Sequence, residues 1–396
     1  MPGRIRHALE EIPTTLDATY ARTLEEIDEQ NWEYAHCLLQ CVAAASRPLR
    51  AEELAGFLAF DLKAGSTPKF LADVRSEDPE NEVLSICSTL LVFVRRRWGS
   101  PVIQFAHFSV KEYLTSARLA KAQHTISRFR ISMTPAHTMV AQACLGLLLH
   151  LDGIITKDRL ECFPLAKYAA RQWVDHARFE NVWSEVQDEV KYLFDPTKGH
   201  LSVWVWIHDR IEFWPGSERS PDPAEARTTP LHYAADYKMH DIATFLIVEH
   251  SQDVNARNLD SGETPLHQSS RHGDVEMAQL FLEHGADANA LDLKNWTPLH
   301  CASKFGRVGA ARVLLEHGVY ANARDANNAT PLHVASDSNY WDEGLLDVVR
   351  ILRQYGADIH ARDDEGRTPF MRATAKGRHN SMIQLLLELG AEDHRM

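Results

Sequence analysis

A repeated tetrapeptide constrains this 396-residue chain more than any other feature of its sequence. Thr-Pro-Leu-His begins at Thr229, Thr264, Thr297 and Thr330, and the variant Thr-Pro-Phe-Met begins at Thr368. The intervals between these starts are 35, 33, 33 and 38 residues. A fixed period of this length indicates a stack of similar structural units, in which each unit buries its apolar face against the next.

Each period predicts two helices. The threonine is suited to cap the first helix, and the proline fits the first helical turn because its missing N–H is not needed there. A second helix, such as AARVLLEHG, is expected to end at a glycine in the left-handed conformation. These glycines are Gly285, Gly318, Gly356 and Gly390, whereas the first period has Ser251 at this place.

This pattern resembles the ankyrin family from about residue 228 to the C-terminus. The resemblance implies five repeats, at 229–263, 264–296, 297–329, 330–367 and 368–396, and an α-solenoid that binds proteins. It also implies that the motif is architectural, with the histidine joining neighbouring repeats, and no metal site is expected. The motif residues are Thr229, Pro230, His232, Thr264, Pro265, His267, Thr297, Pro298, His300, Thr330, Pro331, His333, Thr368 and Pro369.

The resemblance places partner binding on the hairpin tips and the inner helices. Aromatic side chains with arginine or lysine are common anchors of such surfaces. The candidates are Tyr237, Lys238, Arg271, His272, Trp296, Lys304, Phe305, Tyr340 and Trp341. Tyr340 and Trp341 lie in an insert of about five residues within repeat four. The alternative is that each side chain only supports its own repeat.

The N-terminal half predicts a different architecture. Thr14 or Thr15 should start a helix with the apolar stripe Leu16, Tyr20, Leu24 and Ile27. Two further helices are expected in NWEYAHCLLQCVAAAS and RAEELAGFLAF. Two β-prone runs in ICSTLLVFVRRRWGSPVIQFAHF then predict a hairpin. Three short helices followed by a hairpin are typical of a winged helix.

The expected fold class is therefore mainly α: a winged-helix and helical domain with a small β-hairpin, followed by an ankyrin α-solenoid. The expected domains are a winged helix at 10–120, a helical connector at 121–214, a linker at 215–228 and the repeats at 229–396. Trp204, Trp206 and Trp214 are expected to bury the junction between the connector and the first repeat.

The segments PTTLDATYARTLEEI, SRPLRAEELAGFLAFD and VIQFAHFSVKEYLTSA resemble the winged-helix region of fungal NACHT-type signalling NTPases. In those proteins a histidine at the corresponding strand-to-helix corner contacts the phosphates of bound ADP. The resemblance assigns that position to His107, and an imidazole can donate to phosphate oxygens. TPAHTMVAQACLGLLL and FPLAKYAARQWVDHA resemble the helical connector of the same family.

The chain has no GxxxxGK(S/T) phosphate loop. A cofactor is therefore not expected, unless an NTPase domain is supplied upstream or in trans. His107 is expected to serve packing in this chain by itself. The leading expectation is a non-enzymatic interaction and regulatory module. The alternative is the sensor and nucleotide-state clamp of a NACHT ATPase in fungal innate or self/non-self recognition.

Charge and missing motifs argue against several other classes of function. The net charge is −13, spread over both halves, so a broad positive field for nucleic acid is lacking. Arginines at 95–97 with Trp98 at the hairpin tip keep a DNA-binding winged helix as a distant third. No GxSxG nucleophile elbow occurs, so hydrolase activity is not expected.

The expected location is the cytoplasm or the nucleus. The N-terminal residues MPGRIRHALEEIP carry charges where a signal peptide needs an apolar core. No segment is apolar enough over enough residues to be expected to span a membrane. The six cysteines contain no CxxC pair, and all six are expected to be buried free thiols.

Overall fold

A computed structural model describes residues 15–61, 69–71, 78–87, 89–95, 100–122, 124–151, 157–210, 228–338, 344–375 and 380–392. The chain divides into two compact units, residues 1–225 and residues 226–396. The division falls inside the predicted linker, most of which lies outside the described residues.

The first unit begins with short helices and strands. They are α2 (Leu16–Glu25), η1 (Glu29–Asn31), α3 (Trp32–Ala44), β1 (Leu49–Arg50), α4 (Ala51–Ala55), η2 (Gly56–Ala59), β2 (Phe60–Asp61), β3 (Lys69–Phe70), α5 (Pro79–Cys87), β4 (Leu91–Val94), β5 (Val102–Phe105) and α6 (Phe108–Thr115). Thr15 caps α2 as predicted, and its Oγ1 accepts a hydrogen bond from the backbone N–H of Ala18. Leu24 is buried, but Leu16 is 61% exposed, so the predicted apolar stripe does not include it.

The predicted hairpin is confirmed. Strands β4 and β5 pair antiparallel, with Leu91 opposite Phe105 and Val94 opposite Val102. Strand β1 pairs with the other side of β5, which gives the strand order β1-β5-β4. Helix α5 was missed from the sequence: its last residues were taken as the start of a strand, although Val83 and Cys87, one helical turn apart, are both buried.

A buried carboxylate holds the turn between α3 and α4. Both Glu53 oxygens accept hydrogen bonds from Arg47, at 2.7 and 2.8 Å. Glu53 Oε2 also accepts a hydrogen bond from the backbone N–H of Arg50, at the start of α4. One side chain therefore caps a helix and pairs with a guanidinium.

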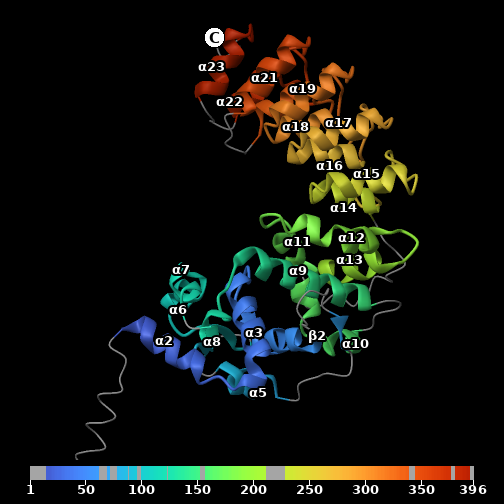
Figure 1. The fold of residues 1–396 in the computed structure, drawn as a ribbon. Helices are drawn as coiled ribbons and strands as arrows, with labels where there is room; N and C mark the ends of the chain where they lie inside the picture. Colours follow the sequence, from blue (N-terminus) through green and yellow to red (C-terminus); the bar gives the residue numbers. More distant parts are fainter. Residues whose placement is uncertain are drawn as a thin grey trace, which may run out of the picture. The chain divides into compact units, whose positions relative to one another are not determined.

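Longer helices complete the first unit (Figure 1). They are α7 (Ala117–Ala120), α8 (His124–Ser127), α9 (Met133–His150), α10 (Lys157–Glu161), α11 (Ala166–Ala177), α12 (Trp183–Phe194) and α13 (His200–Arg210). Helix α9 contacts α3, α11 and α12, so it belongs to the core of both predicted subdomains. The predicted boundary at residue 120 therefore does not separate two compact units.

The tryptophan prediction was wrong for Trp204. Its ring lies 5.7 Å from the ring of Trp173, and its Nε1–H donates to the Ala170 carbonyl inside the first unit. Trp204 and Trp206 are both buried in that unit, and Trp214 lies outside the described residues. These rings fill the core because α11 and α13 pack against each other.

The second unit is a stack of helix pairs that follow each other in sequence order (Figure 1). The inner helices are α14 (Pro230–Asp236), α16 (Pro265–His272), α18 (Pro298–Lys304), α20 (Pro331–Ser336) and α22 (Pro369–Ala375). The outer helices are α15 (His240–Val248), α17 (Val275–Glu283), α19 (Val308–Glu316), α21 (Gly344–Gln354) and α23 (Asn380–Glu388). Each inner helix contacts the next inner helix, which is the geometry of an α-solenoid.

The residues after the outer helices adopt the left-handed conformation. The φ angles are 86° at Gly285, 81° at Gly318, 83° at Gly356 and 98° at Gly390, as the sequence predicts. Ser251 takes the same conformation with φ 49°, although it carries a Cβ. The first repeat therefore keeps the geometry at a conformational cost.

Candidate protein-binding surface

The repeated motif builds the frame that holds the candidate side chains. At His300, the Thr297 backbone N–H donates to Nδ1 at 3.1 Å, while Thr297 Oγ1 accepts from the His300 backbone N–H at 3.4 Å. Thr330 and His333 form the same reciprocal cap. Two of the backbone N–H groups that a helix start leaves without partners are satisfied in this way.

The opposite ring nitrogen ties each inner helix to the end of the loop that leads into the next repeat. The Nε2–H groups donate to the backbone carbonyl of the residue directly before the next Thr-Pro motif, from His232 to Glu263 at 2.8 Å, from His267 to Trp296 at 2.9 Å, from His300 to Ala329 at 3.3 Å and from His333 to Arg367 at 3.0 Å. All four imidazoles are fully buried.

Burial also sets the charge of these rings. Desolvation lowers the pKa of His232 and of His300 to about 4, and it lowers the pKa of His267 and His333 as well. A neutral ring with a hydrogen on Nε2 satisfies both sets of bonds. The four motif histidines are therefore neutral at physiological pH.

The sequence did not reveal what fixes the loops between repeats. Asp292 Oδ1 accepts hydrogen bonds from the backbone N–H groups of Lys294 and Trp296, both at 2.7 Å. Asp325 and Asp363 make the equivalent pairs in the next two loops. Asp292 and Asp325 follow Asn-Ala-X and Asp363 follows His-Ala-Arg, but the hydrogen bonds of these aspartates become visible only with the backbone geometry.

Asparagines connect one loop to the next. Asn322 Nδ2 donates to the Gly356 carbonyl at 2.9 Å, and its Oδ1 accepts from the Asp358 backbone N–H at 2.7 Å. Asn255 makes the same pair with Gly285 and Asp287. The loops are consequently held in a fixed row along one edge of the array.

Most of the predicted anchors lie at the C-terminal ends of inner helices. Arg271 and His272 end α16, and Lys304 and Phe305 end α18. All four are half-buried. Because α16 contacts α18, the structure brings these residues together on adjacent repeats.

These anchors also contact each other. The Arg271 guanidinium lies 5.9 Å from the centre of the Phe305 ring and forms an ion pair with Glu263. Lys304 Nζ lies 5.7 Å from the centre of the Trp296 ring. The cations are thus positioned over aromatic rings before a partner arrives, which lowers the entropy cost of binding.

Other candidates are fixed by the neighbouring repeat. Trp296 Nε1–H donates to Asp325 Oδ2 at 3.1 Å, and His272 Nε2 lies 3.0 Å from Asp236 Oδ1. Tyr237 is half-buried at the end of α14, next to the exposed Lys238, whose φ is 47°. Tyr340 and Trp341 lie outside the described residues. Trp296 and His272 therefore combine a structural contact with partial exposure.

His107 lies at the corner between strand β5 and helix α6, where the sequence placed it. It is exposed and caps α6, and its Nδ1 accepts from the Ser109 backbone N–H at 3.3 Å. Ser109 Oγ lies 2.6 Å from the same nitrogen and 2.7 Å from the Tyr20 hydroxyl. Within the chain His107 therefore serves the start of a helix at the surface and does not lie in the core.

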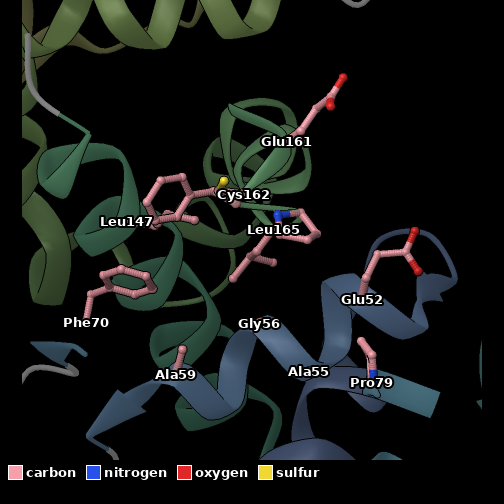
Figure 2. A pocket seen from close by; sticks show the side chains of 12 residues that line it. Glu52, Ala55, Gly56, Ala59, Phe70, Pro79, Leu147, Glu161, Cys162 and Leu165 are labelled. Carbon is pink, nitrogen blue, oxygen red and sulfur yellow. The ribbon is translucent and has the colours of Figure 1, made fainter. Parts of the chain in front are cut away.

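The first unit also contains a cavity of about 240 Å³. It lies between the α4–η2 segment and residues 161–165, and Figure 2 shows Gly56, Ala59, Phe70, Leu147 and Leu165 around it. Glu52, Glu161 and Cys162 also line it. Cys162 is exposed, so the prediction that all six thiols are buried was wrong for this one; the other five are buried.

Neither a metal site nor a membrane-spanning helix is found in the described parts of the chain. Within those parts, no group of three or more His, Cys, Asp or Glu side chains is placed to hold a metal ion. Nor does any helix there combine the length and the apolar composition that a membrane crossing requires. Arg95 follows β4, but residues 96–98 of the proposed DNA-contacting tip lie outside the described residues.

The repeats agree with the comparison to known families. Residues 211–292, 231–325 and 288–363 match the family described as ankyrin repeats (3 copies), and residues 343–387 match ankyrin repeats (many copies). The second unit is therefore an array of ankyrin repeats, a class of modules that typically bind proteins without catalysis.

Individual relatives are more distant. Azaphilone pigments biosynthesis cluster protein L of Monascus ruber is 29% identical over 294 residues, which is 70% of this chain and 61% of that protein. Vegetative incompatibility protein HET-E-1 of Podospora anserina is 30% identical over 123 residues, 30% of this chain and 8% of that protein. Potassium channel AKT3 of Oryza sativa subsp. japonica is 47% identical over 51 residues, 13% of this chain and 6% of that protein. The chain thus spans about three fifths of the Monascus protein.

Proposed function

We propose that this protein is a non-enzymatic interaction and regulatory module that binds a protein partner through the inner-helix ends of its ankyrin repeats. The observation that carries the proposal is the pair of adjacent helix ends with Arg271, Phe305, Lys304 and Trp296. They are half-buried, mutually packed and held by a hydrogen-bonded frame. Rigid aromatic and basic anchors of this kind dominate binding at many interfaces.

The first unit would place the array relative to the partner or to another domain. The similarity to the Monascus protein covers 70% of the chain, which is more than the array alone. It supports a function in which the two units act together.

Affinity capture with quantitative mass spectrometry tests the proposal. The full chain is compared with a Lys304→Asp, Phe305→Asp variant and with a control variant, Arg312→Glu, on the outer helix α19. We expect partners that the full chain and the control enrich and that the inner-surface variant loses. Retention of the same proteins by the inner-surface variant would contradict binding through this surface.

A second candidate is the sensor and clamp part of a NACHT-type signalling ATPase. The similarity to HET-E-1 and the order helix, strand, two helices and hairpin around the β1-β5-β4 sheet favour it. That order is the one expected of a winged helix. In this proposal the exposed His107 would contact nucleotide phosphates through Nε2, since Nδ1 is occupied within the chain.

Calorimetric titration with ADP separates the two candidates. If the leading proposal is correct, the chain binds ADP no better than its His107→Ala variant. A saturable site that disappears in this variant would support the nucleotide sensor instead. DNA binding is tested by electrophoretic shift with random duplex at low salt, and no shift is expected.

A further inference from the structure

Charge is distributed unevenly over the first three repeats. The outer helices α15, α17 and α19 carry four carboxylates and one guanidinium. These residues are Asp241, Glu276, Glu283, Glu316 and Arg312. The outer side of the array is therefore acidic, in keeping with the net charge of the chain.

The inner-helix ends of the same repeats have the opposite charge. They carry Lys238, Arg271, Lys304 and Arg307, so each of the three repeats contributes at least one basic residue. Among the described residues, neither Lys238 nor Lys304 forms an ion pair. The charges of these two lysines are consequently available to a ligand.

The carboxylates near this basic row already have hydrogen-bond or ion-pair partners within the chain. Asp236 accepts from His272, and Asp274 is buried, where it caps α17 and contacts His240. Glu263 is buried beside Arg271 and neutralises part of its charge. In repeat four the equivalent helix end carries Asp337, so the basic row ends with repeat three.

We propose that this row binds an acidic segment of the partner in the extended polyproline II conformation, with carboxylates at every third residue. The proposal rests on the proposed protein-binding function and specifies the chemistry of the partner. Neighbouring packed helices are about 8–10 Å apart. In the polyproline II conformation three residues make one turn and span about 9 Å, so every third side chain lies on the same face. One carboxylate per repeat can therefore meet Lys238, Arg271 and Lys304 in turn.

The surface also accounts for the residues between the carboxylates. Phe305 and Trp296 lie beside Arg271 and Lys304, so an apolar side chain next to each carboxylate would contact a ring. Nucleic acid is the less suitable polyanion, because acidic outer helices flank the row and counterion release needs a broader positive surface.

Fluorescence anisotropy with three nine-residue peptides tests the spacing on the full chain. The first has glutamate at positions 1, 4 and 7 among proline and valine, which favours the polyproline II conformation. The second has the same composition with glutamates at positions 1, 2 and 3, and the third has glutamine in place of glutamate. We expect the first to bind at least about fivefold more tightly than the second, and more weakly as salt increases.

Charge reversal locates the site. Lys304→Glu should weaken the first peptide roughly tenfold, because it removes one attraction and adds one repulsion. Arg312→Glu makes the same change in charge on the exposed outer helix, and we expect it to alter affinity less than about twofold. Equal affinity for the three peptides, an equal effect of both variants, or complete displacement by single-stranded RNA would overturn the proposal.

Selection from a random peptide library separates this inference from the proposed function. Enrichment of acidic peptides that Lys304→Glu no longer binds supports both. Enrichment of peptides without carboxylates that need Phe305 would overturn the acidic partner and leave the proposed function in place. Failure to enrich any peptide would contradict both.

Discussion

The array should lose stability on mild acidification because the histidines that tie its inner helices to the following loops are buried and neutral. The perturbation is a change from pH 7.5 to pH 5.0. His300 is fully buried, donates to the Ala329 carbonyl directly before the next Thr-Pro motif, and burial lowers its pKa to about 4. In the unfolded chain the same ring has a pKa of about 6.5.

The sign of the effect follows from proton uptake. Between pH 6.5 and pH 4 the unfolded chain binds a proton at this ring while the folded chain does not, so the free energy of unfolding falls as the pH falls. At pH 5.0 the loss is about 2 kcal/mol for His300. His232, whose pKa is also about 4, contributes a loss of similar size.

Urea denaturation at both pH values measures the effect. Pulsed hydrogen exchange at one fixed labelling pH assigns the transition to peptides of α16 and α18. The His300→Gln variant should be less stable at pH 7.5, but its difference between the two pH values should be smaller by about 2 kcal/mol. Exposed His360 provides the matched control, and His360→Gln should retain the full difference.

A result in which His300→Gln and the unaltered chain lose the same free energy on acidification would refute this reasoning. It would mean that His300 takes up its proton in the folded state as readily as in the unfolded state. Histidine NMR gives an independent reading, since the ring of His300 should not titrate above pH 5.

Three further changes test the packing described here. Ser251→Gly should stabilise the array by about 1 kcal/mol in urea denaturation, because glycine removes the strain of a left-handed serine; a loss of stability would contradict this. Asn322→Ala should cost about 1–2 kcal/mol, since it deletes two hydrogen bonds between repeats, and exchange of the adjoining loops should become faster. Glu53→Gln should lower the stability of the first unit by about 2 kcal/mol by leaving Arg47 unpaired; an unchanged transition by circular dichroism would refute the role of that ion pair.

The repeats were predictable because their signals are local. A threonine cap, a proline in the first turn and a terminal glycine each act over a few residues, so they mark helix boundaries without knowledge of the fold. The same reasoning succeeded for the hairpin at β4 and β5. It failed for α5, where Val83 and Cys87 are separated by one helical turn but a β-prone run follows directly.

The candidate surface was predictable only as a set of residue types. The family pattern selected Arg271, Lys304 and Phe305, but it did not show that they are half-buried and packed against each other. It also did not identify Asp292, which binds backbone groups of its own loop, or Asn322, whose hydrogen bonds go to backbone groups of the next repeat. The Asn322 contacts join residues about one repeat apart, and sequence spacing does not show which residues at that separation meet.

The sequence by itself determined the period, the number of repeats and the residues that start and end most of their helices, since these depend on backbone preferences of single residues. Only the tertiary structure decided that His107 caps a surface helix, that Trp204 fills the first unit and that the basic side chains of three repeats form one row. The physical reason is that burial and charge balance depend on which helices pack together. That packing is decided by the whole chain rather than by any one segment.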